Sequence, residues 1–113
     1  MKIDKTKIKG STLSIICSGR FGIGSEGNSS AQSIRNELES AIHNADIKIT
    51  EIEIYFRMVE YEWGDGPITA IMSVIDSDLK IKYLANERNA QPLNNLLLQS
   101  GLQKSFNIEI VKV

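Results

Sequence analysis

The stretch Ile47–Ile75, IKITEIEIYFRMVEYEWGDGPITAIMSVI, decides the fold that this sequence predicts. Its first half alternates apolar with polar residues, and this period of two predicts a strand with one apolar face. The turn EYEWGDGP follows, and after it apolar residues recur at helical spacing. The apolar faces are expected to hold Ile52, Ile54, Phe56 and Met58 of the strand, and Ile68, Ile71, Met72 and Ile75 of the helix. Partners and ligands of α/β proteins tend to bind at such strand–loop–helix junctions.

The rest of the chain predicts further strands and helices on both sides of this stretch. A capping-box pattern, Ser29 with Gln32, starts the first helix, and Gly101 is a C′ cap for the last one. The second strand has Leu13, Ile15 and Cys17 on its apolar face. The remaining expected segments are an edge strand at Lys2–Lys9, a strand at Thr12–Ser18, a loop at Gly19–Asn28, a strand at Leu79–Ala85, a helix from Gln91–Pro92, and a strand at Ile108–Val113.

The resulting order, β-β-α-β-α-β-α-β, predicts a single α/β domain over residues 1–113. Each strand–helix–strand step favours parallel pairing with a right-handed crossover. Most strands carry polar residues at alternate positions, whereas a sheet covered on both faces would show continuous apolar runs. We therefore expect a mixed, mostly parallel sheet of four or five strands, with three or more helices mainly on one face.

Composition and charge exclude several classes of protein. The formal net charge is −1, which argues against nucleic-acid binding by bulk electrostatics. The single cysteine, Cys17, allows no internal disulfide and no cysteine metal cluster. No apolar run is long enough for a membrane span, and the first residues lack a signal-peptide pattern. The lone His43 has no second histidine or nucleophile to join, so we expect no metal, no cofactor and no catalytic site, in a cytoplasmic protein.

Four short motifs resemble the STAS family, the sulfate-transporter and anti-sigma-factor-antagonist domains. They are Cys17–Phe21 (CSGRF) after an apolar strand, Val59–Tyr61 (VEY) at the end of the central strand, Leu96–Leu102 (LLLQSGL) in a leucine-rich helix, and Phe106–Ile108 (FNI) in the closing strand. Gly66 is similar to the glycine of that family's switch loop. The resemblance implies a bacterial regulatory domain, not an enzyme, whose partner is an anti-sigma factor or a related kinase-like ATPase.

The switch loop departs from the family pattern. In the family, a serine or threonine just before the loop glycine is phosphorylated by the partner kinase. Here Asp65 occupies that position, and Trp63-Gly64-Asp65-Gly66 contains no hydroxyl group. The resemblance therefore implies the docking loop without its phospho-switch, because an aspartate supplies one negative charge where a phosphate supplies nearly two. Asp65 is also placed to cap the following helix.

The predicted topology brings three loops to one edge of the sheet, where the parallel strands end. A partner-binding surface is expected there, formed by Arg20, Tyr61, Glu62, Trp63, Asp65 and Arg88. Trp63 has two interpretations that the sequence leaves open. Its ring folds back onto the end of the sheet, or it is an exposed anchor for a partner, since tryptophan is enriched among interface hot spots.

Two other functions remain as alternatives to a regulatory protein-binding domain. The segment Gly22–Gly27 (GIGSEG) matches G-x-G-x-x-G between a strand and a helix, which is typical of dinucleotide sites. A small-ligand or nucleotide sensor is therefore possible, although the acid expected about 20 residues further on is missing. An immunity or adaptor protein on a STAS-like fold is the other alternative, since a fold does not determine a function.

Overall fold

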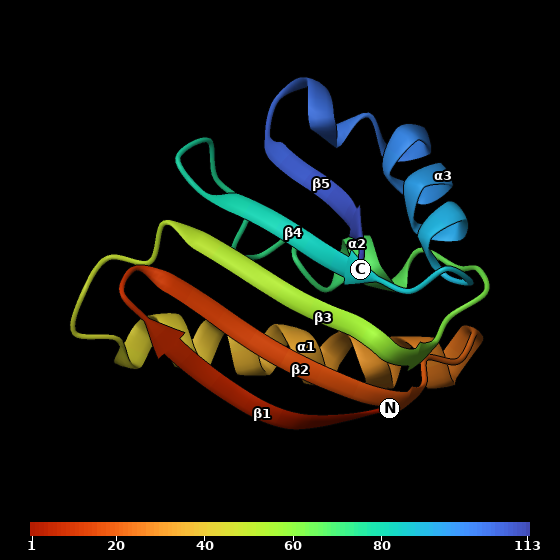
Figure 1. The fold of residues 1–113 in the computed structure, drawn as a ribbon, viewed down its shortest axis with the longest axis horizontal. Helices are drawn as coiled ribbons and strands as arrows, with labels where there is room; N and C mark the ends of the chain where they lie inside the picture. The colour runs from red at the N-terminus through yellow and green to blue at the C-terminus, as the bar shows by residue number, and fades with distance from the viewer.

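The computed structural model describes residues 1–113 and contains one five-stranded sheet with three α-helices (Figure 1). The predicted α/β class is confirmed. The elements are β1 (Lys2–Lys9), β2 (Thr12–Arg20), α1 (Gly24–Asn44), β3 (Glu51–Glu60), α2 (Gly66–Thr69), β4 (Lys80–Ala85), α3 (Ala90–Ser100), the short 3₁₀ helix η1 (Leu102–Lys104) and β5 (Asn107–Lys112).

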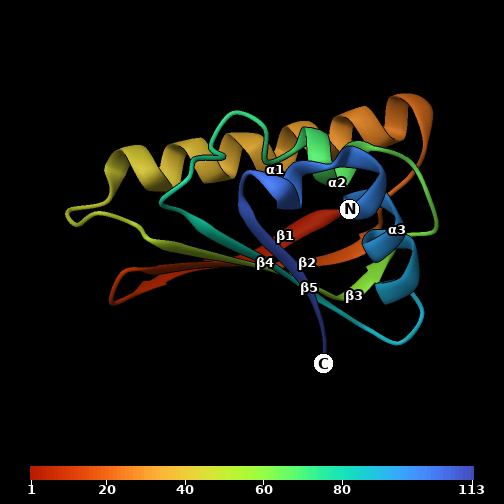
Figure 2. The ribbon, with the colours of Figure 1, turned by 90° about the horizontal axis from the view of Figure 1, so that it is seen from above.

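The strands lie in the sheet in the same order as in the chain, β1-β2-β3-β4-β5. β1 is antiparallel to β2, and the other pairs are parallel. Because the strands step across the sheet in one direction, right-handed crossovers place their helices on the same side. Figure 2 shows α1 and α2 above the sheet and no helix beneath it. The predicted mixed, mostly parallel sheet with its helices mainly on one face is therefore confirmed.

The core lies between this helical layer and the inward side chains of β2, β3 and β4. Its largest fully buried residues include Leu13, Ile15, Ile34, Leu38, Ile52, Ile54, Phe56, Ile81, Tyr83 and Leu93. Cys17 is fully buried on the same face of β2 as Leu13 and Ile15, as its position in the sequence predicts. Burial raises the pKa of its thiol from 9.0 to about 12, because the charged thiolate would lie in an apolar interior.

The end of β3 differs from the predicted alternation. Ile16 pairs with Tyr55 but Ser18 pairs with Met58, so β3 contains one extra residue at this point. This bulge turns Met58 outward, where it is 68% exposed, and places Val59 in the core. The expectation that Met58 faces inward is wrong, because the alternation does not reveal an inserted residue.

The first helix begins earlier than its capping box predicts. α1 starts at Gly24, and Ser29 lies within it, where its carbonyl accepts a bond from the Ser33 hydroxyl (3.0 Å). The expected loop at Gly19–Asn28 therefore includes the end of β2 and the first turn of α1. Glycine has a low helix propensity, and tertiary packing overrides that preference here.

The second helix is shorter than its apolar spacing predicts. α2 is a single turn, Gly66–Thr69, and the chain continues to Val74 through turns that bond Ile71 N to Ile68 O (3.1 Å) and Val74 N to Ile71 O (3.1 Å). Ile71 is buried, but Met72 is exposed, so its predicted place on the apolar face is wrong. Several residues here are β-branched, which weakens an α-helix.

The third helix follows its sequence signals closely. α3 begins at Ala90, one residue before the expected start, and Leu93 and Leu97 are buried against the sheet. Gly101 ends the helix in the left-handed conformation (φ 70°), which glycine adopts without steric cost. The predicted C-terminal glycine cap is confirmed.

Candidate functional site

Three loops meet at the edge of the sheet where the parallel strands end, as the topology predicts. They follow β2, β3 and β4, which are neighbours in the sheet. Surface hollows at this edge are lined by residues from two loops at once: Arg20 and Phe21 with Glu60 and Trp63, and Val59 and Tyr61 with Asn86 and Arg88. We call this surface the carboxyl edge.

Tyr61 is buried beneath the loop that follows β3 and supports it from the interior. Its side chain is 2% exposed, and its hydroxyl donates to the Gly64 carbonyl oxygen (2.6 Å). The ring packs edge-on against Phe21, with 5.9 Å between ring centres. Burial, together with the negative charge of Asp65, raises the pKa of Tyr61 to about 12. The predicted role of Tyr61 as a direct partner contact is therefore corrected to that of an internal support.

Trp63 lies at the outer part of the same loop with its side chain 62% exposed. Of the two interpretations that the sequence leaves open, the structure shows the exposed one. Beside it, an open groove of about 460 Å³ separates the loop from α3. We call this the tryptophan groove, and its lining residues are Tyr61, Glu62, Trp63, Gly64, Asp65, Gln91, Pro92, Asn95, Leu96 and Gln99.

Asp65 is at the N-cap position of α2, but its carboxylate makes no capping hydrogen bond. The bonds that begin the helix run from the backbone N–H groups of Ile68 and Thr69 to its backbone carbonyl oxygen, each at 3.0 Å. The expectation of a side-chain cap is wrong, because the backbone of Asp65 is itself in the helical region (φ −91°, ψ 0°), whereas an N-cap residue is normally extended. The carboxylate is exposed and has no ion pair within the chain.

The remaining predicted contact residues lie on either side of Trp63. Arg20 lines a hollow of about 220 Å³ next to it. On the other side, Arg88 forms an ion pair with Glu62 at 3.4 Å. Both members of this pair are largely exposed, so it adds little stability and is open to exchange with charges of a partner. The structure thus brings five of the six predicted residues to the surface, and Tyr61 beneath them.

A pair of asparagines that the sequence analysis does not single out fixes the end of β3. Asn89 is 1% exposed, and its side-chain N–H groups donate to the carbonyl oxygens of Phe56 and Val59, both at 2.9 Å. Asn86 donates to the Arg57 carbonyl oxygen (2.9 Å). The two asparagines also bond to each other through backbone N–H groups and side-chain oxygens. These carbonyls lie beyond Tyr55, the last residue of β3 that pairs with β4. The N-x-x-N spacing after β4 is the local signal that could have indicated such a turn.

Gly27 of the G-x-G-x-x-G segment has a packing role, and so does Gly66 at the start of α2. A Cβ atom at Gly27 would lie 2.7 Å from the Gly22 carbonyl oxygen, and one at Gly66 would lie 2.3 Å from the Phe21 ring. The glycines thus allow the first turn of α1, the end of β2 and the start of α2 to approach one another closely. The adjacent hollow is lined by Glu60 and Glu62 together with Arg20, and the two carboxylates outnumber the one positive charge that could bind a phosphate group.

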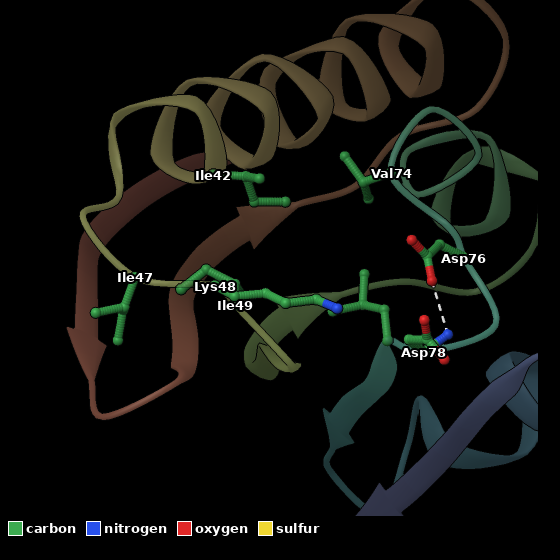
Figure 3. Close-up of a pocket in the computed structure, with 8 residues that line it drawn as sticks. Ile42, Ile47, Lys48, Ile49, Val74, Asp76 and Asp78 are labelled. Carbon is green, nitrogen blue, oxygen red and sulfur yellow. Dashed lines mark hydrogen bonds between the residues drawn. The ribbon is translucent and has the colours of Figure 1, made fainter.

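A second hollow lies at the opposite edge of the sheet, between the end of α1 and the connection from α2 to β4 (Figure 3). Its volume is about 230 Å³. Ile42 and Ile47 line it from the end of α1 and the loop that follows. Val74, Asp76 and Asp78 line it from the connection between α2 and β4 (Figure 3). The Asp76 carboxylate accepts a bond from the Asp78 backbone N–H (2.7 Å), which stabilises the turn before β4.

No group of three or more histidine, cysteine, aspartate or glutamate side chains lies close enough together to hold a metal ion. None of the helices combines the length and apolar character required to cross a bilayer. Comparison of the sequence with protein families and with curated proteins finds no match.

Proposed function

We propose that this chain is a non-enzymatic regulatory domain of the STAS type that binds a protein partner at the carboxyl edge. The observation that carries the proposal is the exposed Trp63 beside the tryptophan groove. A tryptophan that is 62% exposed on a soluble domain leaves a large apolar surface in water. Removing that apolar surface from water in a complex would be favourable. This is one reason why tryptophan is frequent among interface hot spots.

The loop that carries Trp63 is fixed at both of its ends, which favours binding. The Tyr61 hydroxyl bonds to the Gly64 carbonyl on one side. On the other side, the buried Tyr83 hydroxyl donates to the Pro67 carbonyl oxygen (2.5 Å). A loop that is already ordered loses less conformational entropy when a partner binds. These bonds therefore support a docking surface that is preformed in the free protein.

The resemblance to the STAS family gives the partner's class. The loop after the central strand leads through Gly66 into a short helix, which is where that family docks its regulator. We propose an anti-sigma factor or a kinase-like ATPase of a bacterial cytoplasmic regulatory system as the partner. Because the loop has no hydroxyl, Asp65 acts as a permanent acidic contact in this proposal, with its carboxylate free of the helix cap.

Nucleotide sensing through Gly22–Gly27 has less support. Gly27 packs against the Gly22 carbonyl oxygen and Gly22 against the Glu26 side chain. The hollow beside them carries two carboxylates, Glu60 and Glu62, against the single positive charge of Arg20. Calorimetric titration with ATP, GTP and NAD is expected to give no heat of binding. Micromolar binding that is lost in Gly24→Val would support the sensor and contradict the regulatory proposal.

The experiment that tests the docking surface compares Trp63→Ala with a matched control, Met72→Ala. Met72 is also large, apolar and half exposed, but it lies outside the tryptophan groove. A partner captured with the tagged wild-type chain from lysate of its source cells is identified, purified and titrated by calorimetry. Trp63→Ala is expected to weaken binding by about 2 kcal/mol or more, roughly 30-fold, and Met72→Ala by less than about threefold. Equal binding by both variants would contradict the proposed surface.

Substitutions of Asp65 separate the docking surface from the family assignment. Since the carboxylate makes no capping bond, Asp65→Ala should change the free energy of unfolding by no more than about 0.5 kcal/mol. It should still weaken partner binding more than Glu39→Ala, an exposed carboxylate on α1. Asp65→Ser restores the hydroxyl of the family loop, and a kinase-type partner is expected to phosphorylate this variant but not the wild type. If the Asp65→Ser variant binds the partner but is not phosphorylated, the partner is not a kinase of this class. The proposed docking surface would not be contradicted by that result.

A further inference from the structure

The face of the sheet opposite the helices is uncovered (Figure 2) and is divided into an apolar and a charged half. We call it the open face. In the half nearer the carboxyl edge, one outward residue of each of four strands lies in register across the sheet. This apolar row consists of Ile16, Tyr55, Leu84 and Val111. Met58 and Val113, both more than half exposed, extend it. Within the row, Leu84 is only 8% exposed and the other three residues are half-buried, so Met58 and Val113 provide the most exposed apolar side chains of this half. Exposed apolar side chains beside an apolar row on an uncovered face indicate an interaction surface.

The other half of the open face carries charges whose sign alternates from strand to strand. β3 is negative through Glu51 and Glu53, and β4 is positive through Lys80 and Lys82. β5 is negative through Glu109, which pairs with Lys80 at 3.6 Å. β2 contributes only hydroxyls, and β1 adds outward lysines at the edge of the sheet.

We propose that a second copy of this chain covers the open face, in a face-to-face dimer whose two-fold axis runs parallel to the strands, between β3 and β4. With an axis in this direction, the strands of the second copy run across the interface in the reverse order. Residues at the same height along the strands of the two copies still face each other. The apolar row then packs on the apolar row of the other copy, with Tyr55 against Leu84 and Ile16 against Val111. An axis perpendicular to the strands and through the middle of the face would instead place charged side chains on the apolar row, where they would lose their hydration.

The alternating charges select the position of this axis. Between β3 and β4, it places Glu51 and Glu53 of each copy opposite the β4 lysines of the other. An axis along β3 would bring the same glutamates onto themselves. An axis between β2 and β3 would set the β1 lysines against the β4 lysines. Like charges facing each other across an interface are unfavourable, so of these three positions only the first joins apolar contact with opposite charges across β2–β5.

The arrangement agrees with the way that sheets pack on each other. Two twisted sheets stack about 10 Å apart with their strands within roughly 30° of each other, and their inward side chains form one apolar layer. The proposed surface adjoins the carboxyl edge at Met58, which lines a hollow together with Arg88. Trp63 and Asp65 lie in a loop beyond the end of β3. The dimer therefore leaves the tryptophan groove free and would give the assembly two of them.

The first test is the oligomeric state by sedimentation velocity over a concentration series. The wild type is expected to dimerise. Tyr55→Lys places a charge in the centre of the apolar row and should weaken the dimer by roughly a hundredfold or more. Met72→Lys, an exposed apolar position on the helical side, should leave it unchanged. Circular dichroism checks that both variants are folded. A wild type that stays monomeric, or a dimer that tolerates Tyr55→Lys, would overturn the proposal.

The second test uses the paired charges. Lys82 also pairs with Glu51 of its own chain (3.5 Å), so the mixture of the two variants, and not either variant alone, decides the test. Glu53→Lys creates two lysine–lysine contacts in its own dimer, opposite Lys82, and Lys82→Glu creates two glutamate–glutamate contacts. Each variant alone should be mainly monomeric. In an equimolar mixture every such contact has opposite signs again, so a heterodimer should form at the wild-type concentration range. Failure of the mixture to associate while the wild type dimerises would overturn the proposed axis.

Discussion

Asn89→Ala is the substitution that best tests how the carboxyl edge is held in place. The variant removes three hydrogen bonds at a side chain that is 1% exposed: two to the carbonyl oxygens of Phe56 and Val59, and one from the Asn86 backbone N–H. At a net value of about 1 kcal/mol for each bond, the free energy of unfolding should fall by about 3 kcal/mol. Urea denaturation should show this as a midpoint lower by roughly 1–3 M, for a slope of about 1–3 kcal/mol/M.

Two further variants make the result specific. Asn94→Ala, at an exposed position of α3, should stay within about 0.5 kcal/mol of the wild type. Asn89→Asp replaces the donating group with an oxygen that faces two carbonyls, so the pKa of the new carboxyl should be raised in the folded state. Stability from a raised pKa is fully present below the unfolded value of about 3.9 and is lost as the pH rises. The loss relative to wild type should therefore be smaller at pH 4 than at pH 7. If Asn89→Ala unfolded at the wild-type midpoint, the reasoning would be refuted.

Two further predictions concern the interior. A thiol reagent at pH 8 should label Cys17 far more slowly in native protein than in urea, because burial raises the pKa of the thiol to about 12 and little thiolate is present. Equal rates in the two states would show that Cys17 is accessible. Gly27→Ala should lower the free energy of unfolding by roughly 1–3 kcal/mol, because the added Cβ would lie 2.7 Å from the Gly22 carbonyl oxygen. Ser25→Ala, in the same turn but exposed, is the control for this melt, and matching melting temperatures for the two variants would contradict the packing role.

The sequence by itself determined the strands, most of the helices and their order. The alternation in β2, β3 and β4 identifies their buried faces, and the glycine at 101 marks the end of α3. These signals are local, since the period of the apolar residues and the left-handed conformation of a glycine depend on a few adjacent positions. The order of the elements then limits the topology, because parallel crossovers are right-handed. The meeting of three loops at one edge follows from that topology.

Only the tertiary structure decided which side chains of the edge face the solvent. Tyr61 and Trp63 are two residues apart in one loop, yet one is buried and the other exposed, because the Phe21 ring and the Gly64 carbonyl lie where the Tyr61 side chain packs. The bulge in β3 depends on its pairing with β2 and on carbonyl partners near Asn89, which lies about thirty positions further along the chain. The row across the open face likewise needs the register of four strands. Contacts between residues so far apart in sequence leave no local pattern, and so the sequence alone does not reveal them.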